Sequence, residues 1–97
     1  MTKTSFQLGR LVATPGAMEA LQESGETADN FIQRHVSGDC GELCNEDQQA
    51  NEQALLDGSR ILSAYRTRLN VKLWVITEAE NDNGRREVTT VLLVSEY

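Results

Sequence analysis

Hydrophobic and polar residues follow two different periods along this chain. Between residues 14 and 58, apolar side chains recur three and four positions apart, which is the spacing of a helix face packed on a core. After Gly58 the apolar residues come in short β-branched and aromatic runs such as Val71–Thr77, which are typical of strands. The change of period near Gly58 predicts a helical half followed by a sheet.

Capping signals set the ends of the predicted helices. Thr14 can cap a first helix with its hydroxyl, and Pro15 fits the first turn, where its missing N–H costs nothing. Gly25 suits the left-handed position that ends a helix. Similar signals predict a second and a third helix, with boundaries at Thr27, Gly38, Asn45 and Gly58.

The third predicted helix, residues 45–58, is only thinly apolar. Ala50, Ala54 and Leu55 are expected to face the core, whereas the pattern does not place Leu56 on either side. The other positions are mostly Gln, Asn, Glu and Asp. We therefore expect a surface helix with one narrow buried edge.

Strand signals precede and follow the helical segment. A short strand is expected at residues 5–12, and three more are expected after Gly58. In the second of these three, the run Leu73–Ile76 indicates a central strand buried on both faces. Asn83-Gly84 indicates a hairpin turn, because both residues tolerate positive φ. The three C-terminal strands are predicted at residues 60–67, 71–77 and 88–94.

The predicted fold class is α+β, in one domain over residues 1–97. We expect an antiparallel sheet of three to four strands, with two to three helices packed on one face. The helical segment spans 14–58 and the C-terminal β-meander spans 59–97. With 97 residues, 39% of them hydrophobic and 25% charged, the chain can bury one core but not two.

Hydropathy argues against a membrane or secreted protein. No stretch approaches the ~18 apolar residues that a membrane span needs, and the N-terminus lacks an apolar signal segment. We therefore expect a cytoplasmic protein that does not contact the membrane.

Charge is distributed very unevenly along the chain. The formal net charge is −6, yet residues 19–58 carry ten acidic residues against Arg34 alone, a local net charge of −9. A field of one sign repels nucleic acid and attracts basic surfaces. The sequence therefore favours a protein partner with a basic surface, and it argues against direct nucleic-acid binding. The acidic residues predicted to contact that partner are Glu42, Glu46, Asp47 and Glu52.

An alternative site lies on the predicted sheet. Four basic residues on or beside two neighbouring strands could form a modest basic stripe that touches nucleic acid, and such binding would depend steeply on salt. Residues of this kind more often solvate a sheet edge or pair with nearby acids. The four residues are Arg60, Arg66, Arg68 and Lys72.

Catalytic and metal-binding patterns are weak. Cys40 and Cys44 form a C-x3-C pair near His35 and Asp39, but a structural zinc site normally has two such pairs, so we expect free thiols and no metal. His35 is the only histidine, and its place in the last turn of a helix is explained by its charge complementing the helix dipole. A hydrolase or redox protein built on His35 and a cysteine is a weaker hypothesis. We therefore expect a protein that is not an enzyme and that binds no cofactor.

Five short runs of the sequence resemble a family of short bacterial proteins. Members of this family are common on plasmids, integrative elements and prophages, and they usually carry the label hypothetical or that of a restriction-modification subunit. The resemblance extends over nearly the whole chain. The runs are Phe6–Arg10, Ala13–Ala17, Arg34–Asp39, Arg60–Tyr65 and Trp74–Ala79.

The resemblance implies a mobile-element accessory protein, and it brings no established activity with it. This chain departs from the family pattern at Cys40, where the family commonly has Trp, at Cys44, where it has an acid, and in a longer hairpin at residues 81–87. Mobile elements must survive host nucleases, whose nucleic-acid channels are basic. The leading hypothesis is an inhibitor of a host defence complex, of anti-CRISPR or anti-restriction type, that acts by stoichiometric binding. The alternative is a plasmid-maintenance or regulatory protein, and a homodimer paired through the meander edge is also possible.

Overall fold

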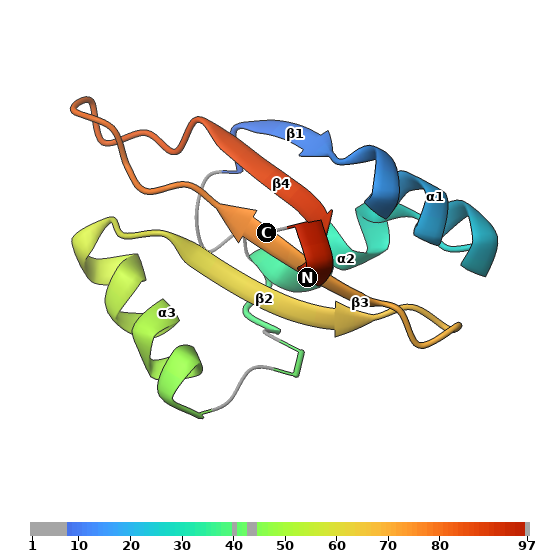
Figure 1. Ribbon diagram of the computed structural model, residues 1–97. Coiled ribbons are helices and arrows are strands. Elements are labelled where there is room, and N and C mark those ends of the chain that lie inside the picture. The colour runs from blue at the N-terminus through green and yellow to red at the C-terminus, as the bar shows by residue number, and fades with distance from the viewer. Residues whose placement is uncertain (1–7, 40, 43–44, 97) are drawn as a thin grey trace.

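The computed structural model describes residues 8–39, 41–42 and 45–96. These residues form a single α+β arrangement, as the sequence predicts (Figure 1). The elements in chain order are β1 (Arg10–Ala13), α1 (Pro15–Ser24), α2 (Ala28–Val36), α3 (Asn45–Asp57), β2 (Ile61–Arg66), β3 (Lys72–Thr77), β4 (Val88–Leu93) and the 3-10 turn η1 (Val94–Glu96).

The sheet is mixed, with strand order β1-β4-β3-β2. The predicted C-terminal meander is confirmed, because β2 pairs antiparallel with β3 and β3 pairs antiparallel with β4. The expectation of a wholly antiparallel sheet is wrong at β1, which pairs parallel with β4. Parallel neighbours need a long connection between them, and three helices and two strands separate β1 from β4 in the chain.

β1 begins later than the predicted strand at residues 5–12. Residues 5–7 lie outside the described residues, and the strand starts at Arg10, whose N–H donates to Glu87 O at 2.8 Å. The preceding Gly9 has φ +66°, and a Cβ there would lie 2.4 Å from the Glu87 backbone. The chain therefore turns at Gly9 to approach β4, and extended pairing becomes possible only after that turn.

The predicted capping residues act at the ends of α1 and α2. Thr14 Oγ1 accepts the Ala17 N–H at 3.2 Å, and Thr27 Oγ1 accepts the Asn30 N–H at 3.4 Å. Gly25 ends α1 with φ +72°. The signals that set these helix boundaries are local, which explains why they can be recognised in the sequence.

The hairpin between β3 and β4 differs in detail from the prediction. Gly84 has φ +72°, but Asn83 does not have positive φ. Instead the side chain of Asn81 shapes the turn, because its Oδ1 accepts the N–H groups of Asn83 and Arg85 at 2.9 and 3.1 Å. The turn is therefore built on an Asn side chain rather than on two left-handed residues.

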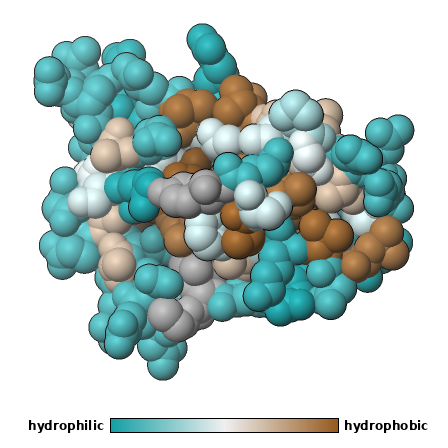
Figure 2. Space-filling model, in the orientation of Figure 1, coloured by the Kyte–Doolittle hydropathy of each residue, from teal (hydrophilic) through white to brown (hydrophobic). Residues whose placement is uncertain are grey.

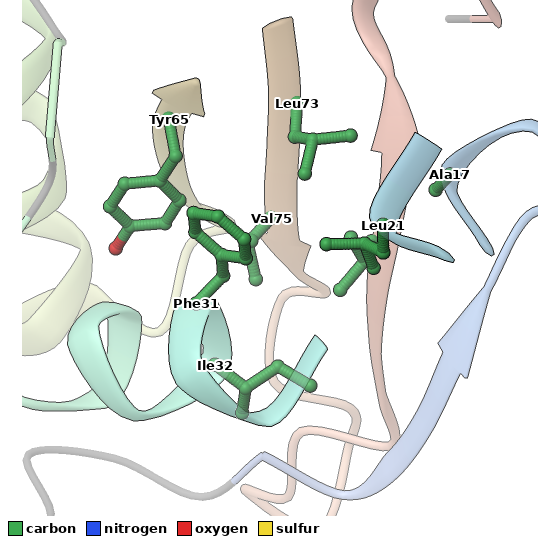
Figure 3. Packing of buried hydrophobic residues seen from close by; sticks show 8 residues of the cluster. Ala17, Leu21, Phe31, Ile32, Tyr65, Leu73 and Val75 are labelled. Carbon is green, nitrogen blue, oxygen red and sulfur yellow. The ribbon is translucent and has the colours of Figure 1, made fainter. Parts of the chain in front are cut away.

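The core lies between the sheet and the helices α1 and α2, which cover one of its faces (Figure 1). Phe31 of α2 packs on Tyr65 of β2, with ring centroids 5.4 Å apart (Figure 3). As predicted, β3 is an interior strand, with Leu73 and Val75 fully buried. The central cluster comprises Ala17, Leu21, Phe31, Ile32, Tyr65, Leu73, Val75 and Val91.

The other face of the sheet carries no α-helix among the described residues; the short 3-10 turn η1 contacts β3, and α3 lies beside the β2 edge rather than over the sheet (Figure 1). Hydrophobic residues occupy the middle of this face, and hydrophilic residues surround them (Figure 2). The helices within the described part of the chain are all too short or too polar to cross a membrane.

Candidate functional site

Asn51, a polar side chain of the acidic helix α3, bonds the helix to the edge of the sheet. Asn51 accepts the Leu62 N–H at 3.0 Å and donates its own amide to the Leu62 carbonyl. The side chain thus makes the two backbone hydrogen bonds that a neighbouring strand would make to the β2 edge. Asn51 and Ala54 are the buried residues of α3.

This docking exposes most of the helix. The predicted narrow buried edge is confirmed, but Ala50 and Leu55, which were expected to face the core, are exposed. The reason is that the helix lies along a strand edge and not on the broad face of the sheet. Glu46, Asp47 and Glu52 are exposed as well, and α3 itself contains no Lys or Arg. Three of the four predicted partner-binding residues therefore lie on one exposed acidic helix.

Glu42, the fourth predicted residue, has a different environment. Its N–H donates to Ala64 O at 2.7 Å, and its carboxylate accepts Arg66 Nε at 2.8 and 2.9 Å. Arg66 also donates to Asn70 Oδ1 at 2.7 Å. Glu42, which was predicted to contact a basic partner, is thus paired with Arg66, which was predicted to contact nucleic acid. Glu42 itself is therefore bonded to the β2 edge, and its charge is locally balanced.

The four basic residues do not form one stripe. Arg66 and Lys72 lie opposite each other at one end of the β2–β3 pair, whereas Arg60 precedes β2 at the other end. The N–H of Arg68 donates to Glu26 Oε1 at 2.7 Å, and this bond is the main cause that lowers the pKa of Glu26. Arg60 is therefore separated from the other three basic residues by the length of β2. Acidic residues balance part of the positive charge of this group.

A shallow cavity of about 260 Å³ lies where α3 meets the open face of the sheet. Leu62 and Trp74 contribute apolar surface to it, while Asp47 and Lys72 contribute charges of opposite sign. Trp74 belongs to the run Leu73–Ile76 that was expected to be buried on both faces, but it is only half-buried. The cavity extends the exposed surface of α3 onto the sheet, but its mixed charge makes it less acidic than the helix.

His35 is buried between α2 and the sheet, with only 1% of its surface exposed. Its Nδ1 lies 2.6 Å from Ser63 Oγ, and its Nε2 lies 2.8 Å from Thr77 Oγ1. The hydroxyl of Thr77 is in turn 2.7 Å from that of Thr89, which donates to Leu8 O at 2.7 Å. These contacts form a chain of hydrogen bonds across the helix-covered face.

Burial lowers the pKa of His35 to about 4, so the imidazole is neutral at pH 7. The explanation of His35 as a charge that complements the helix dipole is therefore wrong, and its role is to satisfy buried hydroxyls. The pair it forms with Ser63 resembles a nucleophile and its base, but Ser63 is also only 1% exposed. No substrate can reach this pair in the folded state.

The cysteine pair lies outside the described residues, so the expectation of free thiols stays a prediction. Within residues 8–39, 41–42 and 45–96, no group of three His, Cys, Asp or Glu side chains is arranged to hold a metal ion.

Arg86 is a structural residue that the sequence did not reveal. It is 5% exposed, and its guanidinium donates to the carbonyls of Ser59, Glu78 and Ala54 at 2.6, 3.1 and 3.1 Å. Ala54 belongs to the last turn of α3, which has no basic residue of its own. A distant arginine thus supplies the positive charge that a helix C-terminus favours. Nothing in the sequence distinguishes Arg86 from its neighbour Arg85.

Comparison of the chain with protein-family models, curated proteins and solved structures found no match. The surface of α3 is therefore interpreted from its own geometry and charge.

Proposed function

We propose that this protein is a non-catalytic binding protein whose helix α3 docks on a basic surface of a protein partner. The observation that carries this proposal is the exposure of Glu46, Asp47 and Glu52 on a helix that contains no Lys or Arg. Because only Asn51 and Ala54 of α3 are buried, the side of the helix that faces away from β2 is accessible to a partner. Carboxylates on such a surface accelerate association with a basic partner and select against acidic ones.

The favoured partner is a nucleic-acid-binding enzyme of a host defence system. Channels that hold nucleic acid are lined with Lys and Arg. An acidic helix can occupy such a channel without catalysing a reaction. The resemblance to proteins of plasmids and prophages supports this setting, since those elements gain from a stoichiometric inhibitor of host nucleases. The proposed contact surface is Glu46, Asp47 and Glu52, whereas Glu42 is paired with Arg66 on the β2 edge.

Direct binding of nucleic acid is less well supported. Arg66 is engaged by Glu42, and the length of β2 separates Arg60 from Arg68 and Lys72. A protein with a net charge of −6 that exposes an acidic helix is repelled by a phosphate backbone.

A charge-reversal experiment tests the proposal. The variant Glu46→Lys/Asp47→Lys/Glu52→Lys should keep the fold, because all three side chains are exposed, and it should lose the partner. The matched control reverses three exposed acids elsewhere, Glu19, Glu23 and Glu78, and changes the net charge by the same amount. Tagged proteins are used to capture partners from nuclease-treated host lysate, and the captured proteins are identified by mass spectrometry.

We expect the wild type and the control to retain a basic nuclease or surveillance complex that the α3 variant does not retain. Retention of the same complex by all three proteins would show that α3 is the wrong surface. Duplex DNA binding that falls steeply with salt, and that is lost on replacing Arg66 and Lys72, would instead support the alternative.

A further inference from the structure

Two large apolar side chains are exposed on α3. Leu55 is 45% exposed and Leu56 is 83% exposed, near the C-terminal end of the helix. The buried residues of α3 are instead Asn51 and Ala54, and Asn51 bonds the helix to Leu62 of β2. A single exposed leucine needs no explanation, but two in succession on the acidic helix are relevant to what that helix binds.

Helix geometry places these leucines beside an acidic residue. Successive residues turn by about 100°, so Leu56 points to the side of α3 opposite the buried Asn51 and Ala54. Glu52 lies three positions before Leu55 and four before Leu56, and it is therefore a surface neighbour of both. Together Glu52, Leu55 and Leu56 make one outward patch, which we call the leucine patch.

The position of α3 leaves this patch without cover from the other helices. The helix stands beside β2, apart from α1 and α2, which pack on the sheet (Figure 1). A second copy of the same patch is an unfavourable partner, because two α3 helices without basic residues would bring their carboxylates together. A surface that carries only positive charge satisfies Glu52 but leaves the leucines in water.

We propose that the leucine patch inserts into an apolar pocket on the partner, and that Lys or Arg side chains surround this pocket. This inference rests on the proposed function and makes the partner chemistry specific. Leu56 is the central anchor, Leu55 packs beside it, and Glu52 pairs with a basic residue at the rim. The arrangement is that of a helix laid in a groove, with apolar anchors three to four positions from a charge. The carboxylates set the rate of encounter, whereas burial of the leucines sets how long the complex lasts.

Two synthetic peptides of equal charge serve as the probe. The first is an amphipathic helix of Leu and Lys, and the second has the same Lys residues with every Leu replaced by Gln. Calorimetric titration of the protein with each peptide at two salt concentrations separates the apolar contribution from the ionic one. We expect the wild type to bind the Leu-containing peptide on the order of tenfold more tightly than its Gln counterpart.

The variant Leu55→Gln/Leu56→Gln should lose this preference and keep the weak, salt-sensitive binding that the two peptides share. Its matched control is Leu69→Gln, because Leu69 is 58% exposed between β2 and β3, away from α3. Unfolding by urea checks that each variant retains the stability of the wild type, as expected for exposed positions. Binding by the control should equal that of the wild type.

The possible outcomes distinguish failure of the leucine patch from failure of the proposed function. A double variant that still prefers the Leu-containing peptide, or a wild type without any preference, overturns the leucine patch while the acidic surface stands. Charge reversal at Glu46, Asp47 and Glu52 should abolish binding of both peptides. If that reversal changes neither titration, or if the wild type binds neither peptide, the proposed function fails and the leucine patch fails with it.

Discussion

At the scale of single residues, the buried polar groups are the least replaceable parts of this protein. His35 and Arg86 are both nearly inaccessible, and each satisfies several partners that are far away in the sequence. The imidazole of His35 bonds the buried hydroxyls of Ser63 and Thr77, and the Thr77 hydroxyl is also bonded to that of Thr89. Such groups are costly when one member is removed, because the others remain buried without a partner.

Acid should destabilise the fold through His35. Its pKa is lowered from 6.5 to about 4, so the unfolded chain binds a proton at a pH where the folded chain does not. Stability from this group is complete above pH 6.5 and is lost as the pH falls toward 4, by about 3 kcal/mol in total. Urea unfolding between pH 7 and 4.5 measures this slope.

The variant His35→Gln should be less stable but should show a flatter slope in the same range. Carboxyl groups do not affect this comparison of slopes. Those whose pKa is lowered, such as Asp39 beside Arg34, lose their contribution to folding stability below about pH 4.5. An unchanged slope in the variant would show that another group titrates in this range.

Arg86→Ala should cost about 3 kcal/mol or more, since it removes the guanidinium donor from the carbonyls of Ser59, Glu78 and Ala54, although the Ala54 carbonyl still accepts the Gly58 N–H. Arg86→Lys should recover less than half of that loss, because one ammonium group cannot reproduce the fork of the guanidinium. The free energies of unfolding of the wild type and both variants, measured in urea, test this prediction. Full recovery by Lys would mean that charge alone, and not the geometry of the three bonds, stabilises this junction.

At the scale of elements, the edge strand β2 is covered by parts of the helical half. Asn51 occupies the backbone groups of Leu62, and the segment at Gly41 and Glu42 pairs with Ala64. A Cβ at Gly41 would lie 2.0 Å from the Ala64 carbonyl oxygen, so only glycine permits this approach. The inner side of the acidic helix therefore covers the sheet edge, and its outer side stays exposed for the partner contact that we propose.

Asn51→Ala should loosen α3 from the sheet. The loss of two hydrogen bonds to Leu62 should destabilise the fold by about 1–2 kcal/mol and speed hydrogen exchange of the Leu62 amide. The control Gln49→Ala, at an exposed position of the same helix, should leave both quantities unchanged. Equal protection of Leu62 in all three proteins would show that α3 is held mainly by other contacts.

At the scale of the whole molecule, the two edges of the sheet differ. The β2 edge of the meander is covered by the helical half. The outer strand on the opposite side of the meander, β4, is paired with β1. β1 is thus the outer strand on its side of the described sheet, with Leu11 49% exposed and Val12 37% exposed. Pairing between two copies, which the sequence placed at the meander edge, is therefore predicted at β1 instead.

Leu11→Lys should shift the sedimentation of concentrated protein toward the monomer, since a charge on an edge strand opposes pairing. Leu69→Lys, which places the same charge at another exposed leucine, should not change the distribution. A wild type that sediments as a monomer at every concentration would contradict the prediction, as would dissociation in the Leu69 variant.

The sequence by itself determined the elements whose signals are local. The caps at Thr14 and Thr27, the terminating Gly25 and the interior strand β3 depend on residues within a few positions of one another. The concentration of acid in one segment is also a property of the sequence alone. Helix ends and strand periods are recognisable for this reason, since propensity and capping act over one turn or one strand.

Only the tertiary structure decided which groups meet across the chain. The parallel pairing of β1, the pairing of Glu42 with Arg66, and the burial of His35 all join residues 24 or more positions apart. The same holds for α3: its pattern suggested that Leu55 faces inward, but a helix docked on a strand edge through Asn51 leaves Leu55 and Leu56 exposed. Periodicity gives the faces of a helix, whereas the surface it packs against decides which face is buried.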